Sequence, residues 1–204
     1  LAAWVVQAVQ VAPDDGHREG HGARAYPARV RRMDAARSLR ALGLRIGALE
    51  PGPTGSIADV AGIGVGHVTV VRDEPEPPAG RGVARTGVTA IVPADPATLR
   101  ERPLAAGVAV LNGAGEMTGS LQVAEWGLLE TPILLTSTMQ VGRALDALVG
   151  LLCDLDPSLG SDRVVIPMVG ECDDSRLNDA RRVQISDADV RAAVNAARSG
   201  PIDE

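Results

Sequence analysis

The sequence predicts a layered α/β domain, and three observations support this fold class. From Ile57 onward, short segments rich in Val and Ile alternate with helical segments. Hydrophobic residues make up 45% of the 204-residue chain, which is enough for a substantial core. Nearly all of them are aliphatic, with no Phe, one Tyr and two Trp, so we expect branched aliphatic side chains to pack between layers.

Five strands are expected, because five segments are rich in Val or Ile and are bounded by Gly, Pro or Asp. Residues 108–111 and 133–135 are apolar at every position, which is typical of strands covered on both faces. Residues 73–80 are rich in Pro and acidic residues, which predicts a surface loop outside the sheet. The expected strands are residues 64–72, 87–93, 107–112, 132–136 and 163–169.

Two helices are expected from apolar residues at helical spacing. The second has clear end signals, because Ser186 can cap it and Gly200-Pro201 ends it. About five strands are few for a layered domain with these helices, so we expect further strands from another chain or another segment. The two apolar stripes are Val141, Ala144, Leu145, Leu148 and Leu152, and then Val190, Ala193, Val194 and Ala197.

Residues 1–33 are expected to be a disordered leader or an over-extended start, and residues 34–204 to be part of a single domain. Residues 1–12 are apolar, but they have no basic segment before them and are too short to span a bilayer. Residues 14–32 are polar and have no sustained apolar period. The sequence therefore predicts no membrane partner.

Composition also disfavours nucleic-acid, metal and cofactor binding. All 20 basic residues are Arg and the net charge is −6, so we expect no uniform basic surface for a phosphate backbone. Cys153 and Cys172 are not at CxxC spacing, and three scattered His residues form no metal-ligand pattern. We expect no metal, no cofactor, reduced cysteines and a cytoplasmic location.

Residues 112–119, with the sequence NGAGEMTG, form the most informative motif, between an expected strand and an expected helix. The motif departs from the dinucleotide pattern because its third Gly comes one residue late and Glu116 is negatively charged. At a helix N-terminus, Glu116 would stay ionised and could receive the ammonium group of a substrate. The alternative is a helix carboxylate that bonds only to the backbone.

A second polar segment, residues 170–179, carries four carboxylates. Such a loop could bind a divalent cation through oxygen, but it does not match the EF-hand order. A solvated acidic loop is the interpretation that we favour. For Asn178 in this segment, an Asx turn is the local alternative to a functional role.

Together these motifs closely resemble the L-aminopeptidase/D-esterase and β-aminopeptidase family, the DmpA-like enzymes, over residues 56–204. Residues 112–119 resemble the family signature NGNGEMTG, with Ala114 in place of the second Asn. Several further blocks match in order: Ile57-Ala58-Asp59-Val60, Val65-Gly66-His67-Val68-Thr69, Gly87-Val88-Thr89-Ala90-Ile91, Gly127-Leu128-Leu129, Thr131-Pro132, Gly170-Glu171, Leu177-Asn178-Asp179 and Gly200-Pro201 with Glu204.

The resemblance implies an N-terminal-nucleophile hydrolase with a four-layer αββα sandwich, completed by a β chain cut from the same precursor. This chain would be the α-chain part, and its partners would be the β chain and further αβ units in a homo-oligomer. The nucleophile would be the new N-terminal Ser or Thr of the β chain, absent from this chain. The freed α-amino group, with a pKa of about 7.7–8.0, can act as the general base.

The same resemblance assigns roles to individual residues. Asn178 would donate its side-chain N–H to the oxyanion of the tetrahedral intermediate. Glu116 and Asn112 would bind the substrate amine and shape the site. Met139 stands where the family has a ring-bearing residue, so this wall of the substrate site would be more adaptable, and substrate preference cannot be transferred.

We therefore expect a serine-type aminopeptidase or amidase that hydrolyses small peptides, amides or esters with a free N-terminal amine. One alternative is an acyl transferase like the ornithine acetyltransferases, which pass the acyl group to an amine. Another is a catalytically inactive binding or structural subunit.

Overall fold

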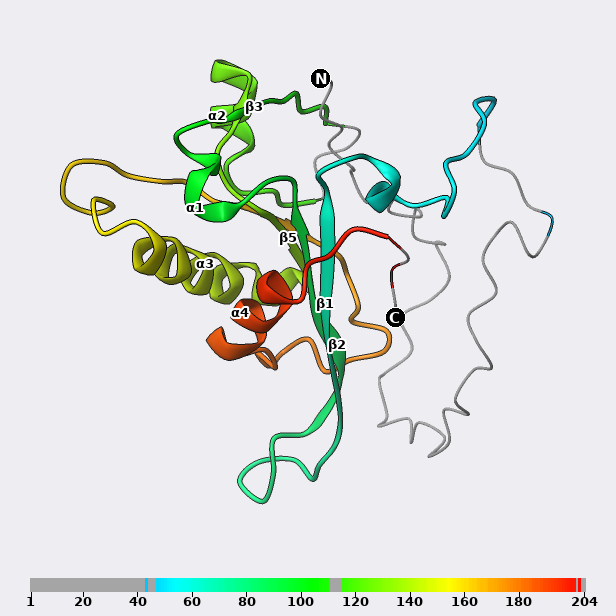
Figure 1. Ribbon diagram of the computed structural model, residues 1–204. Helices are drawn as coiled ribbons and strands as arrows, with labels where there is room; N and C mark the ends of the chain where they lie inside the picture. The colour runs from blue at the N-terminus through cyan, green and yellow to red at the C-terminus, as the bar shows by residue number, and fades with distance from the viewer. Residues whose placement is uncertain (1–42, 44–46, 111–114, 201, 203–204) are drawn as a thin grey trace.

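A mixed four-stranded sheet forms the centre of the computed structural model, which describes residues 43, 47–110, 115–200 and 202 (Figure 1). The strands lie in the order β1-β2-β5-β6. The outer hairpin β1-β2 and the pair β2-β5 are antiparallel, whereas β5 and β6 are parallel. Their bounds are Gly64–Asp73 for β1, Val83–Val92 for β2, Ile133–Thr136 for β5 and Met168–Glu171 for β6.

Helices α3 (Val141–Leu155) and α4 (Asp187–Asn195) cover one face of this sheet (Figure 1). The buried stripe of α3 packs on β5 and β6, and α4 packs on β1 and β2. Ser186 caps α4 as the sequence predicts: its hydroxyl accepts from the Asp189 N–H, and the Asp189 carboxylate accepts from the Ser186 N–H. A side chain at Gly66 would overlap the Ala193 carbonyl, so Gly66 lets α4 approach β1 closely.

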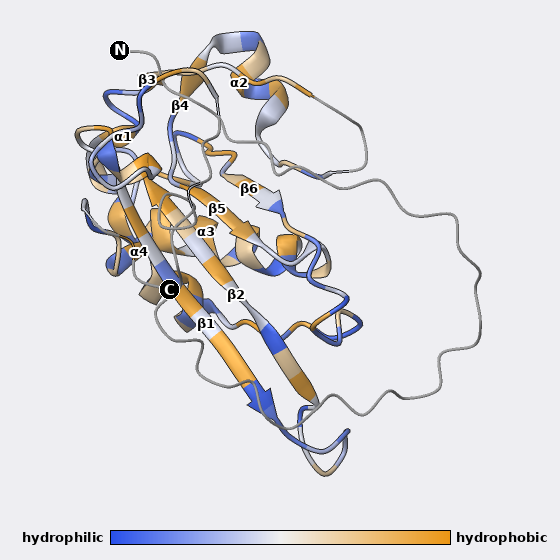
Figure 2. Cartoon of the chain, turned by 90° about the vertical axis from the view of Figure 1, so that its right-hand side faces the viewer, coloured by the Kyte–Doolittle hydropathy of each residue, from blue (hydrophilic) through white to orange (hydrophobic). Residues whose placement is uncertain are grey.

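The opposite face of the sheet is covered at one end only by the described residues (Figure 2). There α2 (Ser120–Trp126) and the two-stranded ribbon of β3 (Leu104–Ala105) and β4 (Leu128–Leu129) close a second apolar cluster with β2, β5 and β6. The short helix α1 (Pro96–Leu99) connects β2 to this ribbon. Further along β1, Val71 projects from the sheet and is exposed, so the part of the chain that the structure describes leaves this end of the face open.

Two strand boundaries differ from those expected. β2 begins at Val83, before the predicted start at residue 87, because the long β1 offers partners up to Asp73. β6 begins at Met168, after the predicted start at residue 163, and runs on to Glu171. Pro167 has no N–H for a strand ladder, so regular pairing starts directly after it.

The predicted strand at residues 107–112 is wrong over residues 107–110, which belong to no strand, and residues 111–112 lie outside the described residues. Val110 is 74% exposed, so the predicted burial on both faces is also wrong there. An apolar run forms a strand only where a neighbour can take its N–H and C=O groups. In the described structure β4 supplies a partner only to Leu104 and Ala105.

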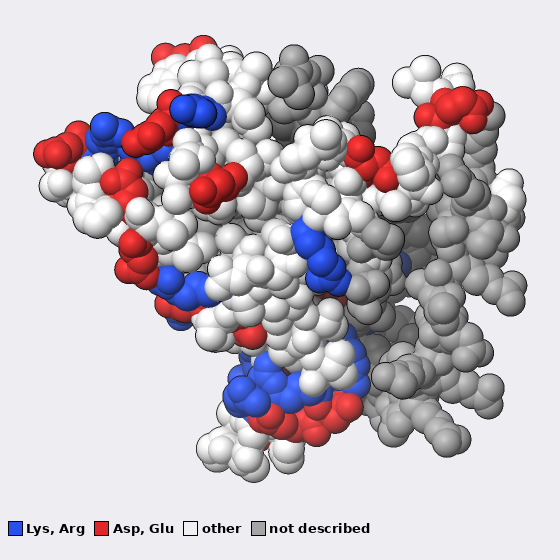
Figure 3. Space-filling view, in the orientation of Figure 1, with Lys and Arg blue, Asp and Glu red and all other residues white. Residues whose placement is uncertain are grey.

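Charges of both signs lie interleaved on the face shown in Figure 3. The loop after β1, predicted to lie outside the sheet, does so, and the Arg81 guanidinium lies 2.7 Å from the Glu74 carboxylate within it. The Arg182 guanidinium, from the segment after β6, lies 2.6 Å from the Glu76 carboxylate of the same loop. The hairpin loop is therefore tied to the segment that carries Asn178.

The described residues form a mixed α/β layer structure, as predicted at the level of fold class. Residues 1–33, the expected leader, lie outside the described residues. No helix in the described ranges is both long and apolar enough to cross a membrane. Cys153 and Cys172 are free thiols.

Candidate active site

The candidate site lies where β5 and β6 end. Because these strands are parallel, their carboxyl ends meet at the same edge of the sheet. Ser137 and the 3-10 turn η2 (Thr138–Gln140) follow β5, and the loop with Asp174 and Asn178 follows β6. Side chains that are about 40 positions apart in the sequence therefore come together, as the Ser137 hydroxyl and the Asp174 carboxylate do at 2.7 Å.

Asn178 is 6% exposed and its carboxamide is held from both ends. Its Oδ1 accepts from the backbone N–H of Arg85 in β2 at 3.1 Å. A backbone N–H can only donate, so this bond fixes the oxygen and turns the NH₂ group to the other side. There Nδ2 lies 3.5 Å from Asp174 Oδ1, at the limit of a hydrogen bond, and one of its two N–H groups remains for another acceptor.

The Asx-turn alternative for Asn178 is wrong. An Asx turn would bond the side chain to its own backbone two residues on. Instead, Oδ1 bonds to a strand residue 93 positions earlier. The side chain therefore serves tertiary structure and leaves a donor oriented at the strand ends.

Glu116 is not at a helix N-terminus, and this expectation was wrong. Helix α2 begins at Ser120, after Gly119 in the left-handed conformation with φ of 71°, and has no acid in its first turn. The chain before Gly119 instead extends along the free edge of β6, where the Glu116 carbonyl accepts from the Glu171 N–H at 3.0 Å. Glu116 is exposed on this edge, and the helix dipole does not stabilise its charge.

Glu171, which the sequence analysis names only within the matching block Gly170-Glu171 and without a role, lies opposite Glu116. The bridge between Met117 and Gly170 sets Glu116 opposite Glu171, so both side chains project from the same face of the pairing. Glu171 is buried, and its carboxylate accepts a hydrogen bond from the Thr138 hydroxyl. A Cβ on Gly115 would lie 3.3 Å from Glu171 Oε1, a tight contact that a small shift of the Glu171 side chain would relieve. The Gly170-Glu171 block was the available signal for Glu171 in the sequence.

Of the two remaining predicted site residues, Met139 lies within the described residues and Asn112 does not. Met139 lies on η2 with an exposed side chain, at the same end of the sheet as Asn178. The structure thus brings Asn178, Glu116 and Met139 to the region where β5 and β6 end, together with Glu171 and Ser137.

An open hollow of about 300 Å³ lies beside the carboxyl ends of β5 and β6, on the uncovered face of the sheet. His67 and Thr89 line it, with His67 Nδ1 and Thr89 Oγ1 2.8 Å apart. Cys172 lines it too, and burial, followed by the charges of Glu171 and Asp174, raises the pKa of its thiol. Because the thiolate is the nucleophilic form, Cys172 is a poor nucleophile at neutral pH.

The Gln140 side chain links the turn after β5 to the rest of the fold. The sequence analysis did not predict this role. The side chain of Gln140 is fully buried. Nε2 donates to the Thr86 hydroxyl at 2.9 Å, while Oε1 accepts from the N–H groups of Gln184 at 2.7 Å and Ile185 at 2.9 Å. One amide therefore links η2, β2 and the segment that leads into α4.

The acidic loop is bonded within the chain. The Ser175 hydroxyl and N–H lower the pKa of Asp173, and the side chain of Arg181 lowers the pKa of Asp179. Arg181 and Arg182 lie 2.7 and 3.1 Å from the Asp179 carboxylate. Across the described residues, no group of three or more His, Cys, Asp or Glu side chains could hold a metal ion.

Comparison with known proteins identifies the family of this chain. Residues 55–204 match the model of peptidase family S58, and the chain belongs to this family. The β-peptidyl aminopeptidases BapA of Sphingosinicella microcystinivorans and Sphingosinicella xenopeptidilytica are 36% and 38% identical to this chain. These matches cover 76% of this chain and 38% of each relative, so the chain spans about two fifths of their length.

Solved structures agree with this placement. The β-aminopeptidase of a Burkholderia species is 41% identical with a TM-score of 0.70, over 81% of this chain and 44% of that one. The PH0078 protein of Pyrococcus horikoshii OT3 is 36% identical with a TM-score of 0.72, over 79% and 46%. The L-aminopeptidase D-Ala-esterase/amidase of Ochrobactrum anthropi, described as a variant of the Ntn hydrolase fold, is 35% identical with a TM-score of 0.68, over 81% and 46%.

Proposed function

We propose that this chain is the α-chain part of a self-processing aminopeptidase or amidase. The enzyme hydrolyses small peptides, amides or esters with a free N-terminal amine through an acyl-enzyme. The nucleophile is an N-terminal Ser or Thr on a β chain from the same precursor. Membership of peptidase family S58 and the similarity to aminopeptidases at 35–41% identity support this reaction class.

The orientation of the Asn178 amide is the observation that carries the proposal. An oxyanion needs donors that are already aimed before charge develops. The Arg85 N–H holds the oxygen of this amide, so the NH₂ group does not have to reorganise during the reaction. The Asp174 contact at 3.5 Å occupies only one N–H and does so weakly, which leaves the second for the oxyanion.

The described part of this chain offers no activated nucleophile at this edge, which supports a nucleophile from elsewhere. The raised pKa of Cys172 keeps its thiol neutral. Ser137 is only 2% exposed, so a substrate carbonyl could not reach its hydroxyl. A terminal Ser or Thr carries its own base, because a free α-amino group has a pKa of about 7.7–8.0, whereas an amide nitrogen in an uncut chain is not basic.

Glu116 binds the substrate ammonium in this proposal, and Met139 forms an adaptable part of the pocket wall. Glu116 is exposed on the edge of β6, at the same end of the sheet as Asn178. A substrate amine there would meet a carboxylate while its carbonyl approached the amide donor. This arrangement predicts that the substrate needs a free amine.

The open sheet face supports the expected four-layer αββα sandwich. The described residues supply one helical layer and one sheet, and Val71 is exposed on the other side of that sheet. A second sheet on this face would bury it, as in sheet-on-sheet packing. We propose that the β chain supplies the second sheet and that the resulting αβ units form a homo-oligomer.

Hydrolysis by the complete gene product tests the proposed function. Leucine p-nitroanilide should be cleaved, whereas N-acetyl-leucine p-nitroanilide should not, because it has no ammonium group for Glu116. Glu116→Gln should raise KM for the first substrate more than it lowers kcat. Equal cleavage of both anilides would contradict the amine site, and acyl transfer to an added amine in preference to water would favour the acyl-transferase alternative.

A further inference from the structure

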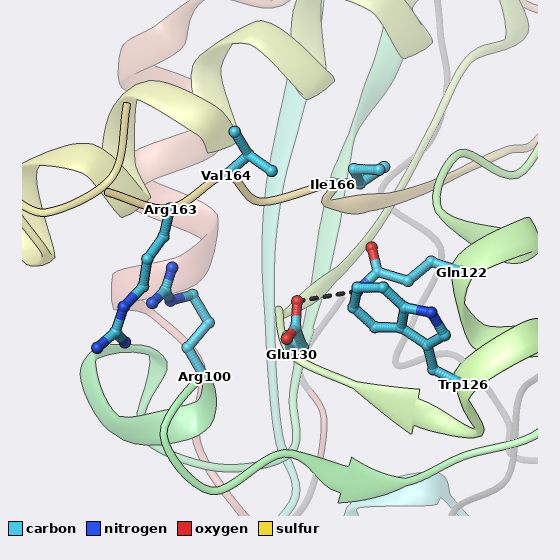
Figure 4. Close-up of a pocket in the computed structure, with 7 residues that line it drawn as sticks. All are labelled: Arg100, Gln122, Trp126, Glu130, Arg163, Val164 and Ile166. Carbon is cyan, nitrogen blue, oxygen red and sulfur yellow. Dashed lines mark hydrogen bonds between the residues drawn. The ribbon is translucent and has the colours of Figure 1, made fainter. Parts of the chain in front are cut away.

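A second pocket, of about 260 Å³, lies apart from the hollow at the candidate site, and Figure 4 shows the residues that line it. The hollow lined by Cys172 and Asp174 adjoins the carboxyl ends of β5 and β6. This pocket is lined instead by Arg100 after α1, by α2, by Glu130 before β5 and by residues 163–166 before β6. It shares no lining residue with that hollow. Its lining residues are Arg100, Gln122, Trp126, Glu130, Arg163, Val164 and Ile166.

One end of the pocket is cationic. The Arg100 side chain is only 8% exposed, and its Nη2 lies 3.2 Å from Asp156 Oδ2. Its Nε is buried and has no acceptor among the described residues. A buried N–H without an acceptor is unfavourable, so the Arg100 guanidinium has hydrogen-bonding capacity that its ion pair with Asp156 does not use.

Arg163 adds a second guanidinium at this end. The Ser158 hydroxyl and N–H lower the pKa of Asp156, and the charges of Arg100 and Arg163 lower it further, so both cations lie near one carboxylate. Asp156 forms an ion pair with Arg100, whereas the Arg163 side chain forms no ion pair among the described residues. The pair can therefore accept another anion, and the planar guanidinium suits a carboxylate.

A carboxylate and an apolar wall complete the lining. Gln122 Nε2 donates to Glu130 Oε2 at 2.9 Å, which holds the Glu130 carboxylate in the pocket (Figure 4). Trp126, Val164 and Ile166 are all exposed large hydrophobic residues. The pocket thus combines a site for an anion, a site for a cation and an apolar surface.

We propose that this pocket binds a free α-amino acid with an apolar side chain. Its carboxylate pairs with Arg100 and Arg163, its ammonium group with Glu130, and its side chain lies against Trp126 and Ile166. An inorganic anion would use the arginines alone and would leave the carboxylate and the apolar wall without a role. The volume suits one amino acid, since it falls just below the range of about 300–1,000 Å³ for pockets of drug-sized ligands.

Calorimetry on the complete gene product tests this assignment without requiring turnover. The probes are L-leucine, 3-methylbutylamine, which lacks the carboxylate, and 4-methylpentanoate, which lacks the amine; none of them can be hydrolysed. L-leucine should bind, and each analogue should bind at least about tenfold more weakly, because a charged partner is left unpaired. An analogue that binds as tightly as L-leucine would overturn the zwitterion assignment.

Variants localise the binding. Arg100→Gln should weaken L-leucine binding by at least about tenfold, whereas Arg102→Gln, at an exposed position close by in the chain, should leave it within about twofold. Arg163→Gln removes an exposed side chain and repeats the test if the buried Arg100 variant does not fold. The proposal fails if the wild-type protein does not bind L-leucine, or if Asn178→Ala abolishes binding while Arg163→Gln leaves it unchanged.

Discussion

The backbone N–H of Arg85 donates to Oδ1 of Asn178 at 3.1 Å and so joins the second strand to the loop after the last one. This bond determines which side of the amide carries its donors. The Arg182 guanidinium, 2.6 Å from Glu76, holds the end of the same loop to the β1–β2 hairpin. The orientation of the Asn178 amide thus depends on contacts between residues that are far apart in the sequence.

Asn178→Asp and Asn178→Ala test the amide both as an oxyanion donor and as a structural link. Asp keeps an acceptor for the Arg85 N–H but has no N–H of its own, so kcat should fall by about 10²–10³. Its buried carboxylate would also face Asp174, whose Oδ1 lies 3.5 Å from Nδ2 of Asn178, so the unfolding free energy at neutral pH should fall as well. Ala also leaves the buried Arg85 N–H unpaired, so it should in addition lower the unfolding free energy by about 1–3 kcal/mol. Steady-state kinetics and urea titration measure the two effects.

Asn195→Asp is the matched control, because Asn195 is exposed at the end of α4. It should change neither quantity. Wild-type kcat in Asn178→Asp would remove Asn178 from the oxyanion site.

Gln140→Leu should lower the unfolding free energy by about 2–4 kcal/mol, because the buried N–H groups of Gln184 and Ile185 and the Thr86 hydroxyl all lose their partner. Gln122→Leu removes a single bond to Glu130 and should cost less than about 1 kcal/mol. Urea midpoints at constant m-value compare the two variants. Equal losses would mean that the Gln140 links contribute little.

Gly66→Ala should destabilise the protein by several kcal/mol, roughly 2–4, because the new Cβ would overlap the Ala193 carbonyl and push α4 away from β1. Gly142→Ala is the matched control in α3, since a Cβ there meets nothing within 4 Å. That change should stabilise the protein by about 0.4–1 kcal/mol. Thermal unfolding of both variants tests the close packing, and a neutral Gly66→Ala would contradict it.

Cys172 should react slowly with iodoacetamide at neutral pH. Burial first, and then the charges of Glu171 and Asp174, raise the pKa of its thiol, so the reactive thiolate forms only at higher pH. In a Cys153→Ser background, the midpoint of the rate-against-pH curve should be higher for the folded than for the urea-unfolded chain. Asp174→Asn should lower the folded midpoint. Coincident folded and unfolded midpoints would contradict the burial of this thiol.

Local signals predicted the helix starts well and long-range pairing poorly. The predicted end of the last helix at Gly200-Pro201 is wrong: α4 ends at Asn195, because Arg198 exchanges backbone hydrogen bonds with Val65 of β1. The Ser186 cap and the α3 stripe depend on residues within one or two turns, and both are present. The start of β2 depends on the length of β1, and residues 107–110 depend on a partner strand that the described structure does not supply. Neither dependence is visible in a single segment.

In the candidate site, too, the sequence predicted some features and missed those that depend on long-range contacts. Family resemblance singled out Asn178 and Glu116, and the structure brings both to the strand ends. It could not show that Arg85 orients Asn178, because that bond spans 93 positions. It also placed Glu116 on a helix, whereas Gly119 in the left-handed conformation separates Glu116 from α2 and leaves it paired with β6. Gln140 gave no signal, since its three partners come from two other segments.

N-terminal sequencing of the purified complete gene product is the most direct test of self-processing. The account predicts two chains in equal amount, the second beginning with Ser or Thr, and loss of both cleavage and hydrolysis when that residue is changed to Ala. A single uncut chain that still hydrolyses leucine p-nitroanilide would contradict it.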